Sequence, residues 1–333
     1  MTKLKIIIIC ICVCISCQEK KEGQHDPEKS FVNEWHIKTD HHVHLMSPHL
    51  ISLWKEMGIP FTRTDHYYAN IDTILKTNKA TNISLVSMAY VYSSRDFGGN
   101  TIDVLKKTQQ ENDYLANAKS KYPDRIKAYY GVDPLSEFAL AEIERCHKTL
   151  KLDGIKLHHN ASQVYLTEPD HLKQVKSVFQ YASDNRIPVL LHFDNSHPNF
   201  GKEDVRILAD SVLKELDFLD LQIAHFGTSG GFSTKTKIIL DRFIDLFEKN
   251  HPITKHKITF DISAVCLDKQ AEGIAPLTQE EFSDLTHYCR KIGYNRIVFG
   301  TDYPLYRTDE YLSILRTKLN LSQIEVEQLL EKK

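Results

Sequence analysis

Short runs of consecutive apolar residues recur along the chain, and longer segments with helical spacing of apolar positions separate them. Segments 104–122 and 171–185 each place their apolar residues on one helical face. Nearly continuous apolar strands are typical of a parallel sheet that is buried on both faces. Eight such strands alternating with helices predict an α/β fold, the (β/α)8 TIM barrel. The predicted strands begin near residues 35, 83, 126, 152, 188, 221, 257 and 296.

An open, doubly wound parallel sheet is the competing architecture for this pattern. That fold places a glycine-rich turn after an early strand, and the sequence has none. The sequence also shows no internal repeat, no low-complexity block and no second domain, so we predict one barrel domain over 35–333. Within it, 46–70 follows the first strand and is rich in Trp, Phe and Tyr, which predicts a lid or a wall of a substrate pocket.

The first residues form a separate unit. Two lysines precede an apolar run at 6–15, which is too short to span a bilayer comfortably. Residues 1–17 resemble a bacterial lipoprotein signal peptide, in which a small residue precedes a lipidated cysteine, here Cys17. The charged stretch that follows predicts a flexible tether over 18–34. We therefore expect an exported protein, lipid-anchored to the bacterial cell envelope on its periplasmic side or outer surface; an uncleaved anchor and ordinary secretion are the alternatives.

Composition limits the classes of possible partner and indicates the state of the cysteines. The formal net charge of −2 gives no global attraction to nucleic acid or to an anionic membrane surface. We therefore expect a small-molecule substrate, no nucleic acid, and membrane contact only through the lipid anchor; an oligomer is compatible with the sequence. Beyond the leader, Cys146, Cys266 and Cys289 are widely spaced and form no CxxC pair, which predicts buried thiols.

Metal-binding residue types fall where the predicted strands end. In a parallel barrel, functional residues gather at the carboxyl ends of the strands. Residues two apart in a strand face the same way, so His42 and His44 can share one metal ion while His41 faces elsewhere. Three later strands end in histidine or aspartate, at His192, His225 and Asp302.

This set has the chemistry of a catalytic metal site. Neutral imidazoles and a carboxylate bind a divalent ion while leaving positions open for water and substrate. The candidate ligands are His42, His44, His192 and Asp302. We expect Zn²⁺, with Mn²⁺ as the alternative, and one ion rather than two. Such an ion lowers the pKa of bound water from about 15.7 toward about 7. Asp302 would accept the proton of that water, and His225 would polarise or protonate the substrate oxygen.

Several further residues are candidates for substrate contact or for orienting the ligands. The fourth strand ends in Lys156 and His158, which share a face, and His159 is expected to face outward. Lys156 would contact substrate or pair with a carboxylate. Arg95, after the second strand, would anchor an anionic substrate. On the seventh strand, Asp261 would orient a metal-site histidine.

The motifs resemble, in order and spacing, those of the amidohydrolase superfamily: TDHHVHL, GIKLH, PVLLHFDNS, IAHFGTSGG and RIVFGTDYP. The resemblance covers roughly 37–305 and is greatest to the amidohydrolase-2 branch, which includes aminocarboxymuconate semialdehyde decarboxylase and several lactonases. TatD-type nucleases also open with HxH, but they carry glutamate where this chain has Lys156. The resemblance implies metal-ligand positions for His42, His44, His192 and Asp302 and a catalytic role for His225. It leaves Lys156 either as a carboxylated bridge between two metals, as in some superfamily members, or without that role, as is usual in this branch.

Three functions follow from these observations. The first is a metal-dependent hydrolase in which metal-activated water attacks a lactone, ester or amide carbonyl of a small organic substrate. The second is a metal-dependent, non-oxidative decarboxylase that uses the same site. The third is a non-catalytic, ligand-binding surface lipoprotein; the complete set of strand-end histidines and aspartate argues against it, because binding alone does not need all of them.

Overall fold

The computed structural model describes residues 36–61, 63–94, 103–271 and 273–331. These residues belong to one compact unit, Trp35–Lys333. The predicted signal peptide, Cys17, the tether and Arg95 lie outside the described residues. Within the described ranges, no helix is both long enough and apolar enough to cross a membrane.

Eight parallel strands form a single sheet in which spatial order follows chain order. The strands are β1 Thr39–Leu45, β2 Asn82–Ser87, β3 Ile126–Gly131, β4 Gly154–His158, β5 Val189–His192, β6 Asp220–Ile223, β7 Lys257–Asp261 and β8 Ile297–Val298. The sheet curls into a nearly closed barrel, because β1 also bonds to the chain at and beyond the end of β8. The His41 amide donates to the Phe299 carbonyl (2.9 Å), and the His44 amide donates to the Tyr303 carbonyl (3.0 Å). All eight strands predicted from the apolar runs are confirmed.

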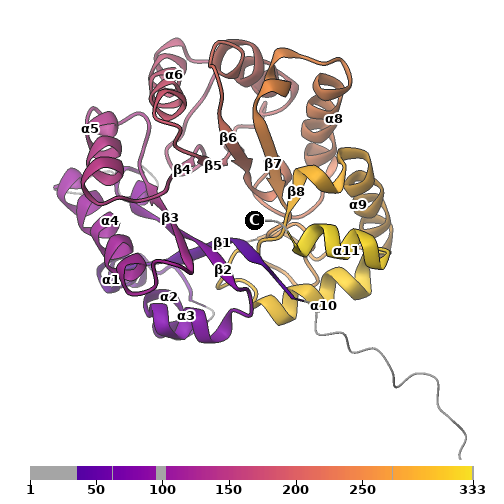
Figure 1. The fold of residues 1–333 in the computed structure, drawn as a ribbon, viewed down its shortest axis with the longest axis horizontal. Helices are drawn as coiled ribbons and strands as arrows, with labels where there is room; N and C mark the ends of the chain where they lie inside the picture. Colours follow the sequence, from indigo (N-terminus) through magenta and orange to yellow (C-terminus); the bar gives the residue numbers. More distant parts are fainter. Residues whose placement is uncertain (1–35, 62, 95–102, 272, 332–333) are drawn as a thin grey trace, which may run out of the picture. The chain divides into compact units, whose positions relative to one another are not determined.

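Helices surround the strands, which occupy the centre of Figure 1. They are α1 Pro48–Glu56, α2 His66–Ala69, α3 Ile71–Thr77, α4 Val104–Lys121, α5 Ala139–Glu144, α6 Pro169–Asp184, α7 Lys202–Ile207, α8 Thr234–Glu248, α9 Gln279–Ile292, α10 Thr308–Lys318 and α11 Gln323–Leu330. Short 3-10 or π turns complete the connections: η1 Ala89–Ser93, η2 Arg145–Thr149, η3 Leu208–Leu213, η4 Ala224–Gly227, η5 Pro252–Lys255 and η6 Tyr294–Arg296. The two helices predicted from their spacing are confirmed as α4 and α6.

The aromatic segment after β1 folds into α1 and α2 and has its own apolar cluster. Met46 bonds through its amide to the Tyr68 carbonyl (2.9 Å), so the two ends of this excursion meet. Leu50 and Tyr68 pack there with Tyr90 and other residues of η1, which follows β2. The excursion is therefore anchored beside the carboxyl ends of the first two strands, where a wall of the active site would have to lie.

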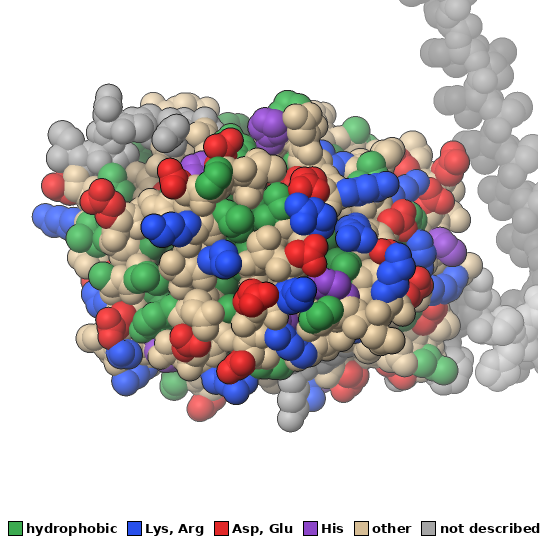
Figure 2. Space-filling view, turned by 90° about the horizontal axis from the view of Figure 1, so that it is seen from above, with side chains coloured by type: hydrophobic (Ala, Val, Ile, Leu, Met, Phe, Trp, Pro, Cys, Tyr) green, Lys and Arg blue, Asp and Glu red, His purple; other side chains and the backbone are tan. Residues whose placement is uncertain are grey.

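Charges of both signs lie on the surface of the folded part, and its three cysteines are buried. On the face shown in Figure 2, basic and acidic side chains are interspersed, in keeping with the small net charge. Cys146, Cys266 and Cys289 are free and buried, as predicted.

Asp40 fastens the start of the barrel to its end. Its carboxylate is fully buried and accepts hydrogen bonds from the Thr301 amide (3.0 Å) and hydroxyl (2.7 Å). The His42 amide (3.2 Å) and the Asn78 side-chain amide (2.7 Å) donate to the same carboxylate. Burial raises its pKa to about 6, and these four donors oppose that rise.

Asp40→Asn is expected to lower the free energy of unfolding by about 2–4 kcal/mol, because the new amide group turns a donor toward donors in a buried position. Urea denaturation at pH 7.5 measures this change. Asp124→Asn, at an exposed position, should leave the urea concentration at the midpoint of unfolding unchanged. Equal midpoints for the two variants would show that Asp40 does not hold the barrel ends together.

Candidate metal centre and active site

His42, His44 and Asp302 bring three metal-binding atoms together at the carboxyl ends of β1 and β8. Asp302 Oδ1 lies 3.0 Å from His44 Nε2 and 3.6 Å from His42 Nε2. Metal–ligand bonds of about 2.0–2.2 Å place neighbouring donors about 3.0–3.6 Å apart. Two imidazole nitrogens and one carboxylate oxygen also suit Zn²⁺ or Mn²⁺. The residues present therefore fit a single divalent ion.

Asp261 holds the His42 imidazole in the orientation that ligation requires. The Nδ1–H of His42 donates to Asp261 Oδ2 (3.1 Å), which leaves Nε2 for the metal. Gln222 Nε2 (2.8 Å) and the Ser263 hydroxyl (2.5 Å) also donate to this carboxylate. The sequence predicted that Asp261 would orient a metal-site histidine, and the structure shows its hydrogen bond with His42.

The buried imidazole of His42 is held neutral. Burial, aided by the positive charge of Lys156, lowers its pKa to about 3, while the carboxylates of Asp261 and Asp302 act in the opposite direction. Only a neutral imidazole has a lone pair to give to a metal, so this ring does not have to lose a proton before it can bind one.

Asp261→Asn is expected to weaken metal binding by about 10- to 100-fold, because the oriented carboxylate partner of a ligating histidine contributes that much in metal proteins. Competition with a chromogenic chelator measures the change. Asp220→Asn is the matched control, since Asp220 begins β6 at the opposite end of the barrel and pairs with Lys257 (2.8 Å). Equal metal affinities in the two variants would contradict the role assigned to Asp261.

Both residues predicted to be catalytic have left-handed backbone conformations. The φ angles are 51° at His225 and 52° at Asp302, a region that residues other than glycine rarely adopt. Such conformations cost of order 1–3 kcal/mol each and cluster at functional sites. Burial would raise the pKa of Asp302, but His225 and the hydrogen bond from His44 bring the pKa well below its usual value. Asp302 is therefore an ionised carboxylate.

The His225 ring lies against the metal-centre histidine. The two rings of His225 and His42 stack with centroids 4.9 Å apart and an interplanar angle of 18°. His225 Nδ1 lies 2.8 Å from the Ser263 carbonyl oxygen, which can only accept. In the neutral form of the ring, Nδ1 therefore carries the proton and Nε2 is a proton acceptor.

His192 lies beside this cluster, and its role as a fourth ligand stays a prediction. Its ring makes an edge contact with His225 (5.3 Å between centroids), and its Nε2 lies 3.2 Å from the Ser229 hydroxyl. Among the described residues, two groups have donor atoms within 4.8 Å of one another, His42 with His44 and Asp302, and His42 with His225 and Asp261, and neither contains His192. A shift of the His192 ring would be needed to bring its nitrogen into the first group.

His158 stacks directly on His192, with ring centroids 3.8 Å apart. The Ala161 amide donates to His158 Nδ1 (3.1 Å), so the neutral ring carries its proton on Nε2 and offers a hydrogen-bond donor. Burial lowers the pKa of His158 well below its usual value, which keeps the ring neutral. A substrate oxygen is a suitable partner for such a donor.

Lys156 reaches the metal centre from β4. Its side chain is 1% exposed, and Nζ lies 3.4 Å from His42 Nε2. Burial lowers its pKa to about 8, although the carboxylates of Asp261 and Asp302 act in the opposite direction. The structure thus places Lys156 where it can contact a substrate bound at the metal, and both its substrate contact and its carboxylation stay predictions.

The expectation for His159 was wrong. This residue is 1% exposed, and its ring lies 5.9 Å from that of Phe193. Alternation along β4 turns Lys156 and His158 toward the barrel interior and His159 toward the other face. In a barrel that other face is covered by helices, so a residue directed away from the interior is buried and not solvated.

Ser263 is a site residue that the sequence analysis missed. Its hydroxyl lies 3.1 Å from His42 Nδ1 and 3.0 Å from His225 Nδ1, and it donates to Asp261. A signal for it exists in the sequence, because Ser263 is two residues beyond Asp261 at a strand end. The same parity rule that paired His42 with His44 would have included it.

A parallel barrel with a histidine–aspartate cluster at the carboxyl ends of its strands is the arrangement of metal-dependent barrel enzymes. Residues 39–332 match the sequence profile of the family described as amidohydrolase, Amidohydro_2. The chain belongs to this family, which confirms the resemblance found in its motifs.

Solved structures share the fold at low sequence identity. A 2,6-dihydroxybenzoate decarboxylase from Rhizobium is 17% identical with a TM-score of 0.60, over 89% of this chain and 96% of that one. A dihydroxybenzoic acid decarboxylase from Polaromonas sp. JS666, with bound manganese and an inhibitor, is 16% identical with a TM-score of 0.56, over 89% and 95%. A probable 2-pyrone-4,6-dicarboxylic acid hydrolase from Acinetobacter baumannii is 17% identical with a TM-score of 0.53, over 88% and 96%. Among curated proteins, no sequence matches this chain.

Proposed function

We propose that this chain is a metal-dependent hydrolase that cleaves a lactone, ester or amide bond of a small organic substrate. The observation that carries the proposal is the convergence of His42 Nε2, His44 Nε2 and Asp302 Oδ1, with donor separations that fit one ion. We favour Zn²⁺, and the manganese of the Polaromonas decarboxylase supports Mn²⁺ as the alternative. When bound, such an ion supplies Lewis acidity, which makes water a better nucleophile and polarises a carbonyl group.

The side chains of the protein then transfer protons and orient the substrate. Asp302 is ionised and accepts the proton of the attacking water. The Ser263 carbonyl accepts the Nδ1–H of His225, so this ring donates to a substrate oxygen through Nε2, when that nitrogen carries a proton. Water oxygen bonds to the carbonyl carbon, the C–O or C–N bond breaks, and the proton passes to the leaving group. The Nε2–H of His158 offers a further donor to the substrate.

Decarboxylation is the second candidate, and the similarity to two decarboxylases favours it. In that reaction a carbon–carbon bond breaks, carbon dioxide leaves, and Asp302 or His225 delivers a proton to the substrate carbon. In this second candidate Lys156 holds a carboxylate of the substrate, and the 3.4 Å distance from its Nζ to His42 Nε2 supports that role. The same residues thus serve both reactions.

Product analysis separates the two reactions. We expect metal-replete protein, offered a panel of lactones, aryl esters and N-acyl amino acids together with 2-pyrone-4,6-dicarboxylate and 2,6-dihydroxybenzoate, to consume water and release an acid without carbon dioxide. Solvent ¹⁸O enters the product of hydrolysis, and chelator-treated protein is the control. Carbon dioxide release would replace this proposal by the decarboxylase. If the protein is fully loaded with metal and returns every compound intact, the hydrolase proposal would be replaced by that of a non-catalytic, ligand-binding protein.

We further propose that the protein is exported and held at the cell envelope by a lipid on Cys17, with the signal sequence in 1–17 as the support. In this proposal Cys17→Ser moves the protein from the membrane fraction to the aqueous fraction, as judged by detergent phase partitioning. Retention of the Cys17→Ser variant in the membrane fraction would contradict the proposal of a lipid on Cys17.

A further inference from the structure

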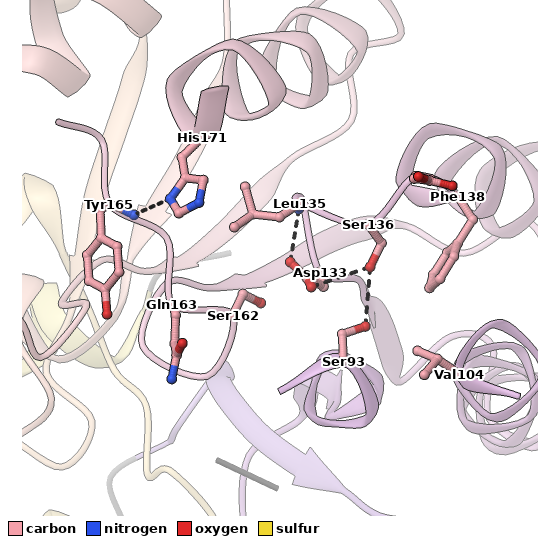
Figure 3. Close-up of a pocket in the computed structure, with 11 residues that line it drawn as sticks. Ser93, Val104, Asp133, Leu135, Ser136, Phe138, Ser162, Gln163, Tyr165 and His171 are labelled. Atoms are coloured by element: carbon pink, nitrogen blue, oxygen red, sulfur yellow. Dashed lines mark hydrogen bonds between the residues drawn. The ribbon is translucent and has the colours of Figure 1, made fainter. Parts of the chain in front are cut away.

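A cavity of about 400 Å³ lies among the segments that follow β2, β3 and β4, next to the start of α6. Its residues, drawn in Figure 3, come from η1, the start of α4, the chain around Asp133, the segment that follows β4 and the start of α6. His42, His44, His225 and Asp302 do not line it, so it is separate from the metal centre. Its volume falls within the range of about 300–1,000 Å³ that small-molecule sites occupy.

Hydroxyl groups and a carboxylate make up one side of this cavity. The Ser93 and Ser136 hydroxyls lie 3.2 Å apart, and Asp133 accepts hydrogen bonds from the Leu135 amide (2.9 Å) and the Ser136 hydroxyl (3.3 Å). Figure 3 shows these groups as one connected row. Protein bonds thus hold the row in place before any ligand arrives, which reduces the ordering cost of binding.

The facing side carries further polar groups. The Tyr165 amide donates to His171 Nδ1 (3.1 Å), so the neutral His171 ring presents an N–H at Nε2. Gln163 has a left-handed backbone (φ 50°), and such strain is found preferentially at ligand sites. Ser162 is 8% exposed, and its hydroxyl is buried without a hydrogen-bond partner in the described part of the chain. This buried hydroxyl would gain a hydrogen bond if a side-chain rotation turned it toward an occupant of the cavity.

The charges of the lining residues select among possible occupants. Asp133 and the exposed Glu137 contribute carboxylates, and no lysine or arginine is among the described residues that line the cavity. Carboxylates accept strong hydrogen bonds from hydroxyl groups and repel anions. Phe138, Leu135 and the Tyr165 ring add apolar surface beside these groups, as the C–H faces of a sugar ring require.

We propose that this cavity is a binding site for an uncharged polyhydroxylated ligand, a sugar ring or a cyclic polyol. The turn at 158–163 connects its wall to the histidines beside the metal centre: the Ser162 amide bonds to the carbonyl of His158, whose ring stacks on His192. The site does not rest on the proposed hydrolase activity, because none of its groups takes part in that chemistry.

Calorimetric titration of the metal-replete protein tests the proposal with D-glucose, D-galactose and myo-inositol as neutral probes. At least one should bind saturably, and D-glucuronate, the carboxylate counterpart of glucose, should bind at least about 10-fold more weakly than glucose. Glu137→Gln should reduce the difference in affinity between D-glucose and D-glucuronate. Absence of saturable binding for all three neutral probes, or glucuronate affinity equal to that of glucose, would overturn the proposal.

A matched pair of serine variants locates the binding. Ser162→Ala should weaken the best neutral probe by about 5- to 30-fold, because it removes a buried hydrogen-bonding group. Ser177→Ala should leave the affinity unchanged, because this exposed hydroxyl on α6 bonds to its own helix, at the Lys173 carbonyl (3.1 Å). Equal affinities in both variants would place sugar binding elsewhere. A protein that binds the probe but turns over no candidate substrate would overturn the hydrolase and leave this site standing.

Discussion

Asp302→Asn is expected to reduce kcat by about 10³- to 10⁴-fold on whichever substrate the protein turns over. Asparagine preserves the size of the side chain but removes its charge, so it is a poor metal ligand and cannot accept a proton. It also removes the carboxylate to which His44 bonds at 3.0 Å. The loss should appear in kcat more than in KM, because proton transfer is a property of the transition state.

The control for this variant is Asp309→Asn. Asp309 lies on α10, is exposed, and pairs with Arg307 (3.2 Å), so its loss should leave kcat within about twofold of the parent, since exposed ion pairs contribute little. Circular dichroism and the unfolding midpoint establish that both variants are folded. An Asp302→Asn protein with more than a tenth of the parent kcat would exclude Asp302 as the proton acceptor.

His42→Ala is expected to abolish stoichiometric metal binding and, with it, measurable turnover. The substitution removes one donor nitrogen and leaves Asp261 buried without the imidazole that it orients. A buried carboxylate deprived of its partner also destabilises the fold, by about 3–5 kcal/mol where a full ion pair is broken. His44→Ala is therefore the companion variant, because His44 is only partly buried and its loss leaves Asp261 paired.

Elemental analysis after gel filtration measures the metal content of these variants. The parent should carry about one ion per chain, and each variant less than about a tenth of that. His287→Ala, at an exposed position on α9, should retain the parent content. Full occupancy in both His42→Ala and His44→Ala would place the metal elsewhere in the protein.

The sequence predicted the barrel well because its strands are buried on both faces. Such strands have continuous apolar runs, as in 188–191 and 297–299, and each run coincides with a strand of the structure or overlaps it. The contacts that close the barrel were not predictable. The bond from the His41 amide to the Phe299 carbonyl joins residues more than 250 positions apart, and no local pattern encodes it.

The candidate site was predicted in part, for a reason that lies in strand geometry. Parity along β1 placed His42 and His44 on one side, and the structure brings their Nε2 atoms within 3.6 Å of Asp302 Oδ1. Parity also misled at His159, because the face away from the barrel interior is buried by helices. The hydrogen-bond partners of the site residues were harder to predict from the sequence. The carbonyl that fixes the His225 tautomer belongs to Ser263, on a different strand end, and follows only from the tertiary fold.

The most direct test of the metal centre is a crystal structure of protein loaded with Mn²⁺ or Zn²⁺, with anomalous diffraction recorded on both sides of the metal's absorption edge. We predict one ion within about 2.0–2.3 Å of His42 Nε2, His44 Nε2 and Asp302 Oδ1. The distance from the ion to the nearest ring nitrogen of His192 would then show whether His192 is the fourth ligand. An anomalous peak away from these three atoms, or none in a crystal of active protein, would contradict the account.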